Sequence, residues 1–356
     1  MRIGKLDNDQ LNELILSKFR HTRSEVVCSP RIGVDCAAVD LGGRLAVLST
    51  DPITSAANNL GQLTVHVSCN DAAAAGAEPV GLLVTLLAPP TATEADIARV
   101  ADELALAAEQ AGVEIIGGHT EVTDSVTRMV TCTTVLAKAG EHGVLDARDV
   151  RAGNELVLTK SAGLEGAAIL ASDFSALLSG VPEEALVQAR GFFQEVSVVK
   201  EGLYAAAHGA VAMHDVTEGG VLGALWEMAE AARCRVVIDR AAIPIHPATA
   251  EIAAALGLDP LRLLSSGAML IACVDGDALV RGLRELGIPA AKIGRTVQGS
   301  GACFTDGTQI APPGADELYK LHAPDAPNSA KCRFVKHVGR YSNEGKGWAS
   351  NTVKGA

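Results

Sequence analysis

The sequence predicts a two-domain protein that combines helices with strands, of the α/β and α+β class. Three observations support this. The chain has 356 residues, a length that usually means two domains. Both halves alternate segments of helical period with short continuous apolar runs. A polar stretch at 146–154 separates the halves, so we expect one domain over 1–148 and a second over 149–318.

The first half contains three expected helices and four expected strands. Residues 94–111 have the clearest helical period, and Thr93 with Asp96 resembles a capping pair at its start. Residues 80–88 are continuously apolar, as expected for a strand covered on both faces. The expected helices span 7–19, 60–77 and 94–111, and the expected strands span 44–50, 80–88, 113–116 and 129–137.

The second half continues the same mixture of elements. The expected strands span 155–160, 210–213, 235–238, 268–274 and 291–297. The expected helices span 163–178, 182–208, 219–232, 248–255 and 277–286. No internal repeat of 20–50 residues interrupts this order.

Charge and hydropathy exclude several classes of protein. The formal net charge of -12 argues against a nucleic acid or an anionic membrane as the main partner. No uncharged apolar run reaches about 18 residues, and the first residues lack the apolar core of a secretory signal. The eight cysteines are widely spaced, without a C-x-x-C pair, which favours free thiols over a zinc site. We therefore expect a cytoplasmic protein.

The last residues differ in composition from the rest. Residues 321–356 contain six basic and two acidic side chains, whereas the rest of the chain carries a strong negative charge. We expect 319–356 to be a mobile tail or an extension outside the fold. A tail that presents Cys332 to the body is the functional alternative.

Acidic residues recur at the ends of apolar strands or beside glycines, and they indicate the chemistry. They are Asp35 in G-V-D-C, Asp51 in S-T-D-P, Asp71 in C-N-D-A and Asp215 in H-D-V-T-E-G-G. A carboxylate in apolar surroundings is costly to bury unless it is paired or binds a cation. Several converging carboxylates would suit Mg²⁺, which prefers oxygen ligands and bridges to phosphates. The alternative is that each Asp caps a helix or a turn.

Glycine pairs lie beside these acids. Gly117-Gly118 follows an expected strand, and Gly219-Gly220 begins an expected helix. Glycine lets backbone N–H groups approach an anion closely, and a helix N-terminus favours phosphate. The sequence lacks a Walker loop, a G-x-G-x-x-G fingerprint, H-E-x-x-H and G-x-S-x-G, so the common nucleotide folds and hydrolase triads lose support.

The ordered series of motifs resembles the aminoimidazole ribonucleotide synthetase family over roughly residues 1–318. This family includes selenophosphate synthetase, thiamine-monophosphate kinase and a hydrogenase maturation factor. The matching segments are GVDCAAV at 33–39, STDP at 49–52, NDAAAAGAEP at 70–79, GGHT at 117–120, VLTKSAGLEG at 157–166, MHDVTEGGVLGA at 213–224, SSGAML at 265–270 and Lys292-Ile293-Gly294.

The resemblance implies the two-domain PurM-like fold, in which the N-terminal mixed sheet pairs with that of a second subunit and a C-terminal α+β domain follows. It implies a homodimer that binds ATP through Mg²⁺, or Mn²⁺, held by carboxylates. The implied metal ligands are Asp35, Asp51, Asp71 and Asp215. The implied cofactor-binding residues are Thr50, Asn70, Gly117, Gly118, Thr120, Gly219 and Gly220.

Departures from the family pattern leave the acceptor open. The chain has neither the cysteine-ended tail of the maturation factor nor the Cys–Lys loop of selenophosphate synthetase. His119 stands where the kinase and the maturation factor carry Asp. We expect His119 to be either an acid–base group or a structural histidine. Cys36, beside Asp35, is the first candidate for a covalent nucleophile, although a structural thiol is the simpler interpretation.

Together these observations predict an ATP- and Mg²⁺-dependent enzyme that phosphorylates or activates a small oxygen or amide acceptor. His119 and Asp215 are the candidate catalytic residues. Two alternatives remain: a metal-dependent phosphate-ester hydrolase that uses the same acids, and a non-catalytic nucleotide-binding protein of a maturation complex.

Overall fold

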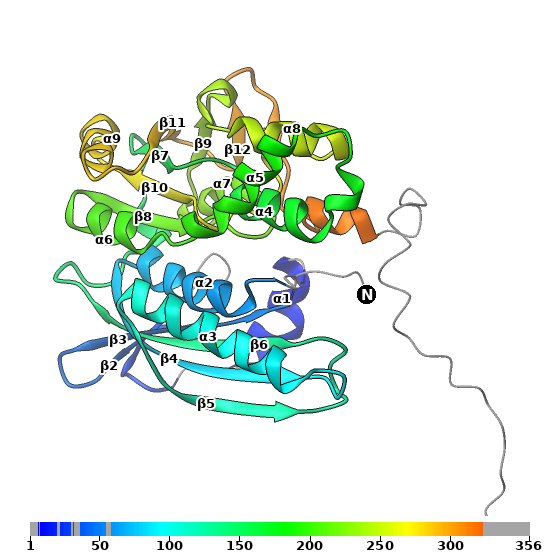
Figure 1. Cartoon of the computed structure of the whole chain (residues 1–356). Helices are drawn as coiled ribbons and strands as arrows, with labels where there is room; N and C mark the ends of the chain where they lie inside the picture. Colours follow the sequence, from blue (N-terminus) through cyan, green and yellow to red (C-terminus); the bar gives the residue numbers. More distant parts are fainter. Residues whose placement is uncertain are drawn as a thin grey trace, which may run out of the picture.

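Two β-sheets, stacked with helices between them, form the core of the protein (Figure 1). The structure is a computed structural model that describes residues 6, 8–19, 22–29, 31, 36–54 and 58–322. The segment that joins the two sheets carries the short 3-10 helix η2 (Ala147–Asp149).

The N-terminal sheet has six strands in the order β1-β2-β3-β6-β4-β5. All neighbours are antiparallel except β4 and β5, which run parallel and are joined through a helix. The strands are β1 (Val26–Cys28), β2 (Ala37–Asp40), β3 (Leu45–Ile53), β4 (Ala77–Ala88), β5 (Glu114–Val122) and β6 (Val130–Ala139). The helices are α1 (Asn8–Leu14), the 3-10 turn η1 (Leu16–Lys18), α2 (Leu60–Ala74) and α3 (Glu94–Ala111).

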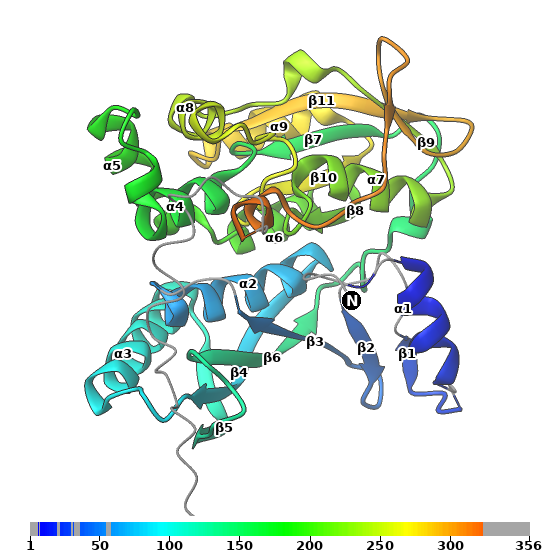
Figure 2. The same ribbon diagram turned by 90° about the vertical axis from the view of Figure 1, so that its right-hand side faces the viewer.

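Helices α2 and α3 cover one face of this sheet, and the opposite face is open in the described part of the chain (Figure 2). The predicted capping pair is present on α3, where Thr93 and Asp96 bond each other's backbone. Strand β6 alternates fully buried Thr131, Thr133 and Val135 with partly exposed residues, as a sheet with one open face requires.

The C-terminal sheet has seven strands in the order β13-β12-β9-β11-β7-β10-β8. Strand β10 is entirely buried and β7 nearly so, whereas β11, in the middle of the sheet, keeps several partly or fully exposed residues. The strands are β7 (Glu155–Thr159), β8 (Ala210–Asp215), β9 (Arg235–Ile238), β10 (Met269–Cys273), β11 (Ala290–Val297), β12 (Ala302–Phe304) and β13 (Gln309–Ile310). The helices are α4 (Leu164–Asp173), α5 (Glu183–Gly191), α6 (Val199–Ala207), α7 (Gly220–Ala232), α8 (Pro247–Leu256) and α9 (Gly276–Glu285), with 3-10 turns η3 (Ser175–Leu177), η4 (Phe192–Glu195), η5 (Arg240–Ala242) and η6 (Glu317–His322).

Helix α2 is the element that joins the two halves. Leu63 packs in an apolar cluster with α4, α5 and α8, and Ala73 and Ala74 pack with residues of β8 and β10. The other side of α2 contacts the N-terminal sheet through Val65, Cys69 and other apolar side chains. Because both sides are covered, nearly every residue of α2 is buried.

Two sequence predictions for the C-terminal half are wrong. The expected helix 182–208 is broken into α5, η4 and α6, and residues 196–198 lie outside any helix. The expected tail begins too early, since residues 319–322 belong to η6, where Leu321 packs on the body and Tyr319 donates to Glu218. Residues 323–356, with Cys332, lie outside the described residues.

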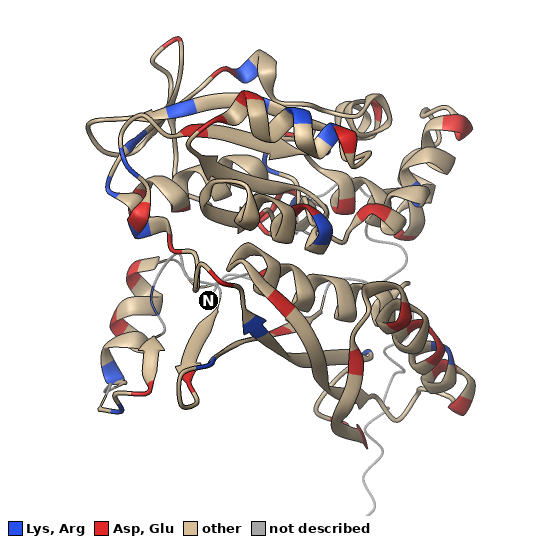
Figure 3. Cartoon of the chain, turned by 90° about the vertical axis from the view of Figure 1, so that its left-hand side faces the viewer, with Lys and Arg blue, Asp and Glu red and all other residues tan. Residues whose placement is uncertain are grey.

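Charged side chains are spread over both halves (Figure 3). Within the described residues, no helix is both long and apolar enough to cross a bilayer.

The contact of α2 with α6 is close enough to require glycine. A Cβ atom on Gly202 would lie 2.8 Å from the Ala73 carbonyl oxygen. We therefore expect Gly202→Ala to lower the unfolding free energy by about 1–3 kcal/mol through overpacking. Differential scanning calorimetry would record this as a lower Tm.

The matched control is Gly191→Ala at the end of α5, where φ is helical and a Cβ meets nothing within 4 Å. That substitution should leave Tm unchanged or raise it slightly. Equal Tm values for the two variants would contradict a tight contact between α2 and α6.

Candidate active site between strand β3 and helix α2

Two of the predicted acids meet beneath α2. The Ser49 hydroxyl donates to Asp71 Oδ2 at 2.6 Å and lies 3.5 Å from Asp51 Oδ2. Ser49 and Asp71 are buried, and Asp51 is partly exposed. The chain thus brings Asp51 from β3 and Asp71 from the last turn of α2 to the same hydroxyl group.

The pleat of β3 explains this meeting. Alternate residues of a strand face the same side, so Ser49 and Asp51 both face α2. Asp51 was expected at the end of its strand, but β3 continues to Ile53, and Asp51 pairs with Thr133 of β6. Thr133 is 1 % exposed, and its hydroxyl has no hydrogen-bond partner. Four oxygen-bearing side chains, Ser49, Asp51, Asp71 and Thr133, are therefore neighbours where the sheet packs against α2.

The other two predicted metal ligands, Asp35 and Asp215, are not shown in contact with Asp51 and Asp71. Asp215 is the last residue of β8, pairs with Met269 and is 2 % exposed. The neighbouring His214 is fixed by Glu227 at 2.9 Å. Asp35 lies outside the described residues. Within the described ranges, no three His, Cys, Asp or Glu side chains gather in a group that could hold a metal ion.

Thr50 and the G-G-H-T segment lie on a different surface from the acids. Thr50 faces away from α2 and accepts a hydrogen bond from Thr134 at 3.1 Å. The segment 117–120 does not follow its strand but is part of it: β5 is an exposed edge strand, so Thr120 is also exposed. His119 pairs with Thr85 of β4, and its Nε2 lies 3.2 Å from Glu121 Oε2.

Gly118 has a role within the sheet rather than in a loop. Its φ is +147°, and a Cβ atom would lie 1.8 Å from the Val84 carbonyl oxygen. Only glycine lets β5 approach β4 this closely. The sequence predicts that this glycine pair approaches an anion, and that stays a prediction; the group that Gly118 approaches in the structure is a neighbouring strand.

Asn70 is occupied by the protein itself. Its Nδ2 donates to the Val196 carbonyl oxygen and its Oδ1 accepts from the Val198 N–H, both at 2.8 Å. The side chain is fully buried. Asn70 was predicted to bind the cofactor, but its amide instead links α2 to the C-terminal half.

The Gly219-Gly220 turn, also predicted to bind phosphate, is capped by a carboxylate of the same chain. The Gly219 N–H donates to Asp316 Oδ2 at 3.0 Å, and the Gly220 N–H donates to the Thr217 carbonyl oxygen. Asp316 also accepts from the Leu318 N–H at 3.0 Å. An internal anion thus occupies the helix N-terminus that was expected to receive phosphate.

Asp316 belongs to a buried group of acids that the sequence did not reveal. Burial raises the pKa of Asp316 to about 6, against hydrogen bonds that lower it. Burial also raises the pKa of Glu165, in the first turn of α4, to about 7, and the charges of Asp316 and Glu218 add to this. No local motif joins these residues, because they come from three distant segments.

Two further features lie outside the candidate site. Burial and then the charge of Asp71 raise the pKa of the Cys69 thiol to about 12, which makes it a poor nucleophile.

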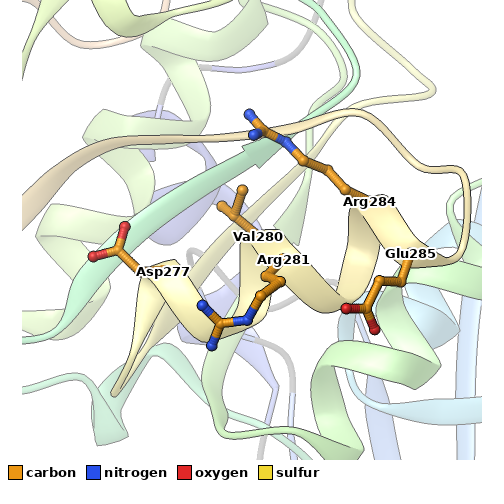
Figure 4. A pocket seen from close by; sticks show the side chains of 5 residues that line it. All are labelled: Asp277, Val280, Arg281, Arg284 and Glu285. Carbon is orange, nitrogen blue, oxygen red and sulfur yellow. The ribbon is translucent and has the colours of Figure 1, made fainter.

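A surface hollow of about 550 Å³ runs along α9 and is lined by Asp277, Val280, Arg281, Arg284 and Glu285 (Figure 4). It contains no residue of β3 or α2.

Both sheets match a known family in order. Residues 33–138 match the N-terminal domain of AIR synthase related proteins, and residues 151–305 match the C-terminal domain. The chain belongs to the AIR synthase-related family. Carbamoyl dehydratase HypE of Cupriavidus necator is 30% identical over 280 residues, which covers 75% of this chain and 78% of that relative.

Solved structures share the fold of this AIR synthase-related protein. A ThiL structure, AaThiL complexed with AMPPCP and TMP, has a TM-score of 0.71 at 18% identity and covers 89% of this chain and 98% of its own. Hydrogenase maturation protein HypE in complex with ATP has a TM-score of 0.66 at 20% identity and covers 89% of this chain and 97% of its own. These likenesses establish the PurM-like fold.

The raised pKa of Glu165 predicts how stability depends on pH. Its pKa is about 7 when folded, against an ordinary value of 4.5 for a glutamate exposed to water, so the folded state holds the proton more tightly. The stability that Glu165 contributes is then fully present below about pH 4.5 and is lost as pH rises through about 7. We expect a loss on the order of 3 kcal/mol over this window, measured as a fall in Tm from pH 5 to 8.

Glu165→Gln should flatten this part of the curve, because an amide does not titrate there. Glu109→Gln, at an exposed position of α3, is the matched control and should keep the wild-type slope. A Glu165→Gln variant with the full wild-type slope would assign the pH dependence to other groups.

Proposed function

We propose that this AIR synthase-related protein is an ATP- and Mg²⁺-dependent enzyme that phosphorylates or activates a small oxygen or amide acceptor. The observation that carries the proposal is the meeting of Asp51 and Asp71 about the Ser49 hydroxyl, beneath a helix of the family fold. The solved HypE and ThiL structures with ATP and AMPPCP support nucleotide binding by this fold.

The donor set of the site fits Mg²⁺. All the donors are oxygens, from two carboxylates and two hydroxyl groups, and the buried Thr133 hydroxyl still has no partner. Mg²⁺ is commonly held by one or two carboxylates together with substrate phosphates, so the pair suffices without a third acid. Asp51 and Asp71 would hold the ion, which when bound supplies charge neutralisation for the nucleotide phosphates.

The protein's own contribution is to position these oxygens. The Ser49 hydroxyl donates to Asp71 Oδ2, which fixes that carboxylate against β3. Asp71 is buried, so its charge acts in surroundings from which water is largely excluded, where electrostatic interactions are stronger. Asp215, buried at the end of β8, is the proposed acid–base group.

The test compares isosteric variants of the acids. Asp71→Asn should weaken Mg²⁺–ATP binding by about 10–100-fold, because the amide cannot supply a charged ligand but still accepts from Ser49. Isothermal titration calorimetry measures this directly. Asp102→Asn, on the exposed face of α3, is the matched control and should bind as the wild type does.

Turnover provides the complementary measurement. ADP formation that persists unchanged after Asp51→Ala and Asp71→Ala together would contradict the assignment. Hydrolysis of a simple phosphate ester with metal and without nucleotide would favour the hydrolase alternative instead.

We further propose that two copies pair through the open faces of their N-terminal sheets. Strands β4 and β5 expose five large apolar side chains, Val80, Leu83, Ile115, Ile116 and Val122. Leu83 lies on the open face opposite Thr134, whereas Ile115 and Val122 pair with the buried Leu82 and Ala88 and so lie on the helix side of the edge strand. An apolar side chain exposed on an open sheet face is typical of an interface. Thr50 and His119 lie on the same open face, on the other side of the sheet from Asp51. A second copy bound to this face would therefore cover Thr50 and His119.

This arrangement predicts an effect of charge on the open face. Leu83, on β4, is 47% exposed and pairs with Thr134. We expect Leu83→Asp to reduce the mass in light scattering from that of a dimer to the 36.6 kDa of one chain. Val274→Asp, at a more exposed apolar position after β10, is the control and should leave the dimer intact. A wild-type chain that is monomeric throughout would overturn the pairing.

A further inference from the structure

The broken helix between η4 and α6 is held open by side chains from both halves of the protein. Gln62 of α2 donates to the Phe193 carbonyl oxygen at 2.7 Å. Asn70, two turns later on α2, bonds both the Val196 carbonyl and the Val198 N–H. These contacts use backbone groups that a continuous helix would have bonded internally, so the interruption is stabilised from outside.

Lys160 holds the same segment from the opposite side. Its ammonium donates to the Ser197 carbonyl at 2.6 Å and to the Glu195 carbonyl at 3.0 Å. It also pairs with Glu201 at 2.7 Å, and the Lys160 and Glu201 side chains are only 12% and 2% exposed. Two hydrogen bonds and one ion pair therefore hold the ammonium group inside the protein.

The backbone at Lys160 is unusual as well. Its φ is +52°, in the left-handed region that lysine rarely adopts. Residues held in this region are strained by on the order of 1 kcal/mol and persist where the surroundings fix them. The strand β7 ends at Thr159, so this conformation turns the Lys160 side chain out of the sheet and towards residues 195–201.

A second observation concerns His66 of α2. His66, one turn before Asn70, is 6% exposed, and its Nδ1 has no hydrogen-bond partner. Burial and then the charge of Lys160 lower the pKa of His66 to about 4. The ammonium group therefore acts on the same stretch of α2 that carries Asn70 and, next in the chain, Asp71.

We propose that Lys160 is a positioning residue for the oxygen site: it fixes residues 195–198 against Asn70 and so sets where Asp71 lies relative to Asp51. The chain of contacts runs from the Lys160 ammonium to the 195 and 197 carbonyls, then through Val196 and Val198 to Asn70. Asp71 follows Asn70 on the same rigid turn of helix. This role rests on the proposed function of the site.

Because the Lys160–Glu201 ion pair is buried, a positioning role of Lys160 can be tested separately from a contribution to stability. A buried ion pair can often be replaced by apolar side chains without loss of stability, whereas removing one partner leaves a costly buried charge. The variant Lys160→Met with Glu201→Leu therefore removes the pair together. It should keep a Tm close to that of the wild type and lose the hydrogen bonds to residues 195 and 197.

The experiment measures Mn²⁺ binding in the presence of ATP by electron paramagnetic resonance on the full chain. We expect the double variant to bind Mn²⁺–ATP about tenfold more weakly, with an altered spectrum of the bound ion. The matched control replaces the exposed pair, Lys292→Met with Asp277→Leu, which are 2.6 Å apart and bond outside the 195–198 segment. The control should keep the wild-type affinity and spectrum.

Lys160→Arg is the second variant, for the case in which the double variant fails to fold. It keeps the charge beside Glu201, but its planar guanidinium cannot reproduce the two hydrogen bonds of the ammonium group to the 195 and 197 carbonyls, so binding should still weaken. Wild-type affinity and spectrum in a folded Lys160 variant would overturn the positioning role and leave the proposed function intact. Absence of Mn²⁺–ATP binding by the wild type would overturn both.

Discussion

The burial of polar side chains on α2 is the constraint on which the rest of the arrangement depends. A helix between two layers has little solvent to satisfy its polar groups, so most of them, with the exception of His66 Nδ1, bond within the protein. Thr64, Ser68 and Asp71 do so towards the helix backbone or the sheet, and Asn70 does so towards the C-terminal half. These bonds fix the rotation of α2 about its axis and its position along that axis. The same bonds therefore fix both the candidate site and the contact between the two halves.

The sequence carried most of the fold because most elements follow their own periodicity. The α3 helix, with its Thr93 cap, and the buried strand β4 correspond closely to the segments expected at 94–111 and 80–88. The expected helix 182–208 failed for a tertiary reason. Its local pattern is helical throughout, but Asn70 and Lys160 compete for the backbone of residues 195–198. The local sequence of residues 182–208 cannot indicate that Asn70 and Lys160, more than 30 residues away, will bond to its backbone.

The candidate site was predictable to the same extent. Asp51 and Asp71 could be identified because a carboxylate among apolar residues needs a reason to be there, and they do meet. The glycine pairs were weaker indicators of a phosphate site, because a glycine indicates only that some other group approaches the backbone closely and not which group it is. At Gly118 that group is a strand, and at Gly219 it is the Asp316 carboxylate. Ser49 and Thr133 escaped notice because hydroxyl groups in strands are common and become informative only when their neighbours are known.

The bond from Gly219 to Asp316 has a consequence for the order in which the protein is made. The two residues are 97 positions apart in the chain. At a synthesis rate of 5–20 residues per second, the start of α7 therefore exists for roughly 5–20 s before its capping carboxylate has been synthesised. During that interval the helix N-terminus must be satisfied by water or by a solvent anion. The C-terminal half is thus completed by one of its latest segments, and a ribosome that stalls before residue 316 would leave a nascent chain with that helix end still open.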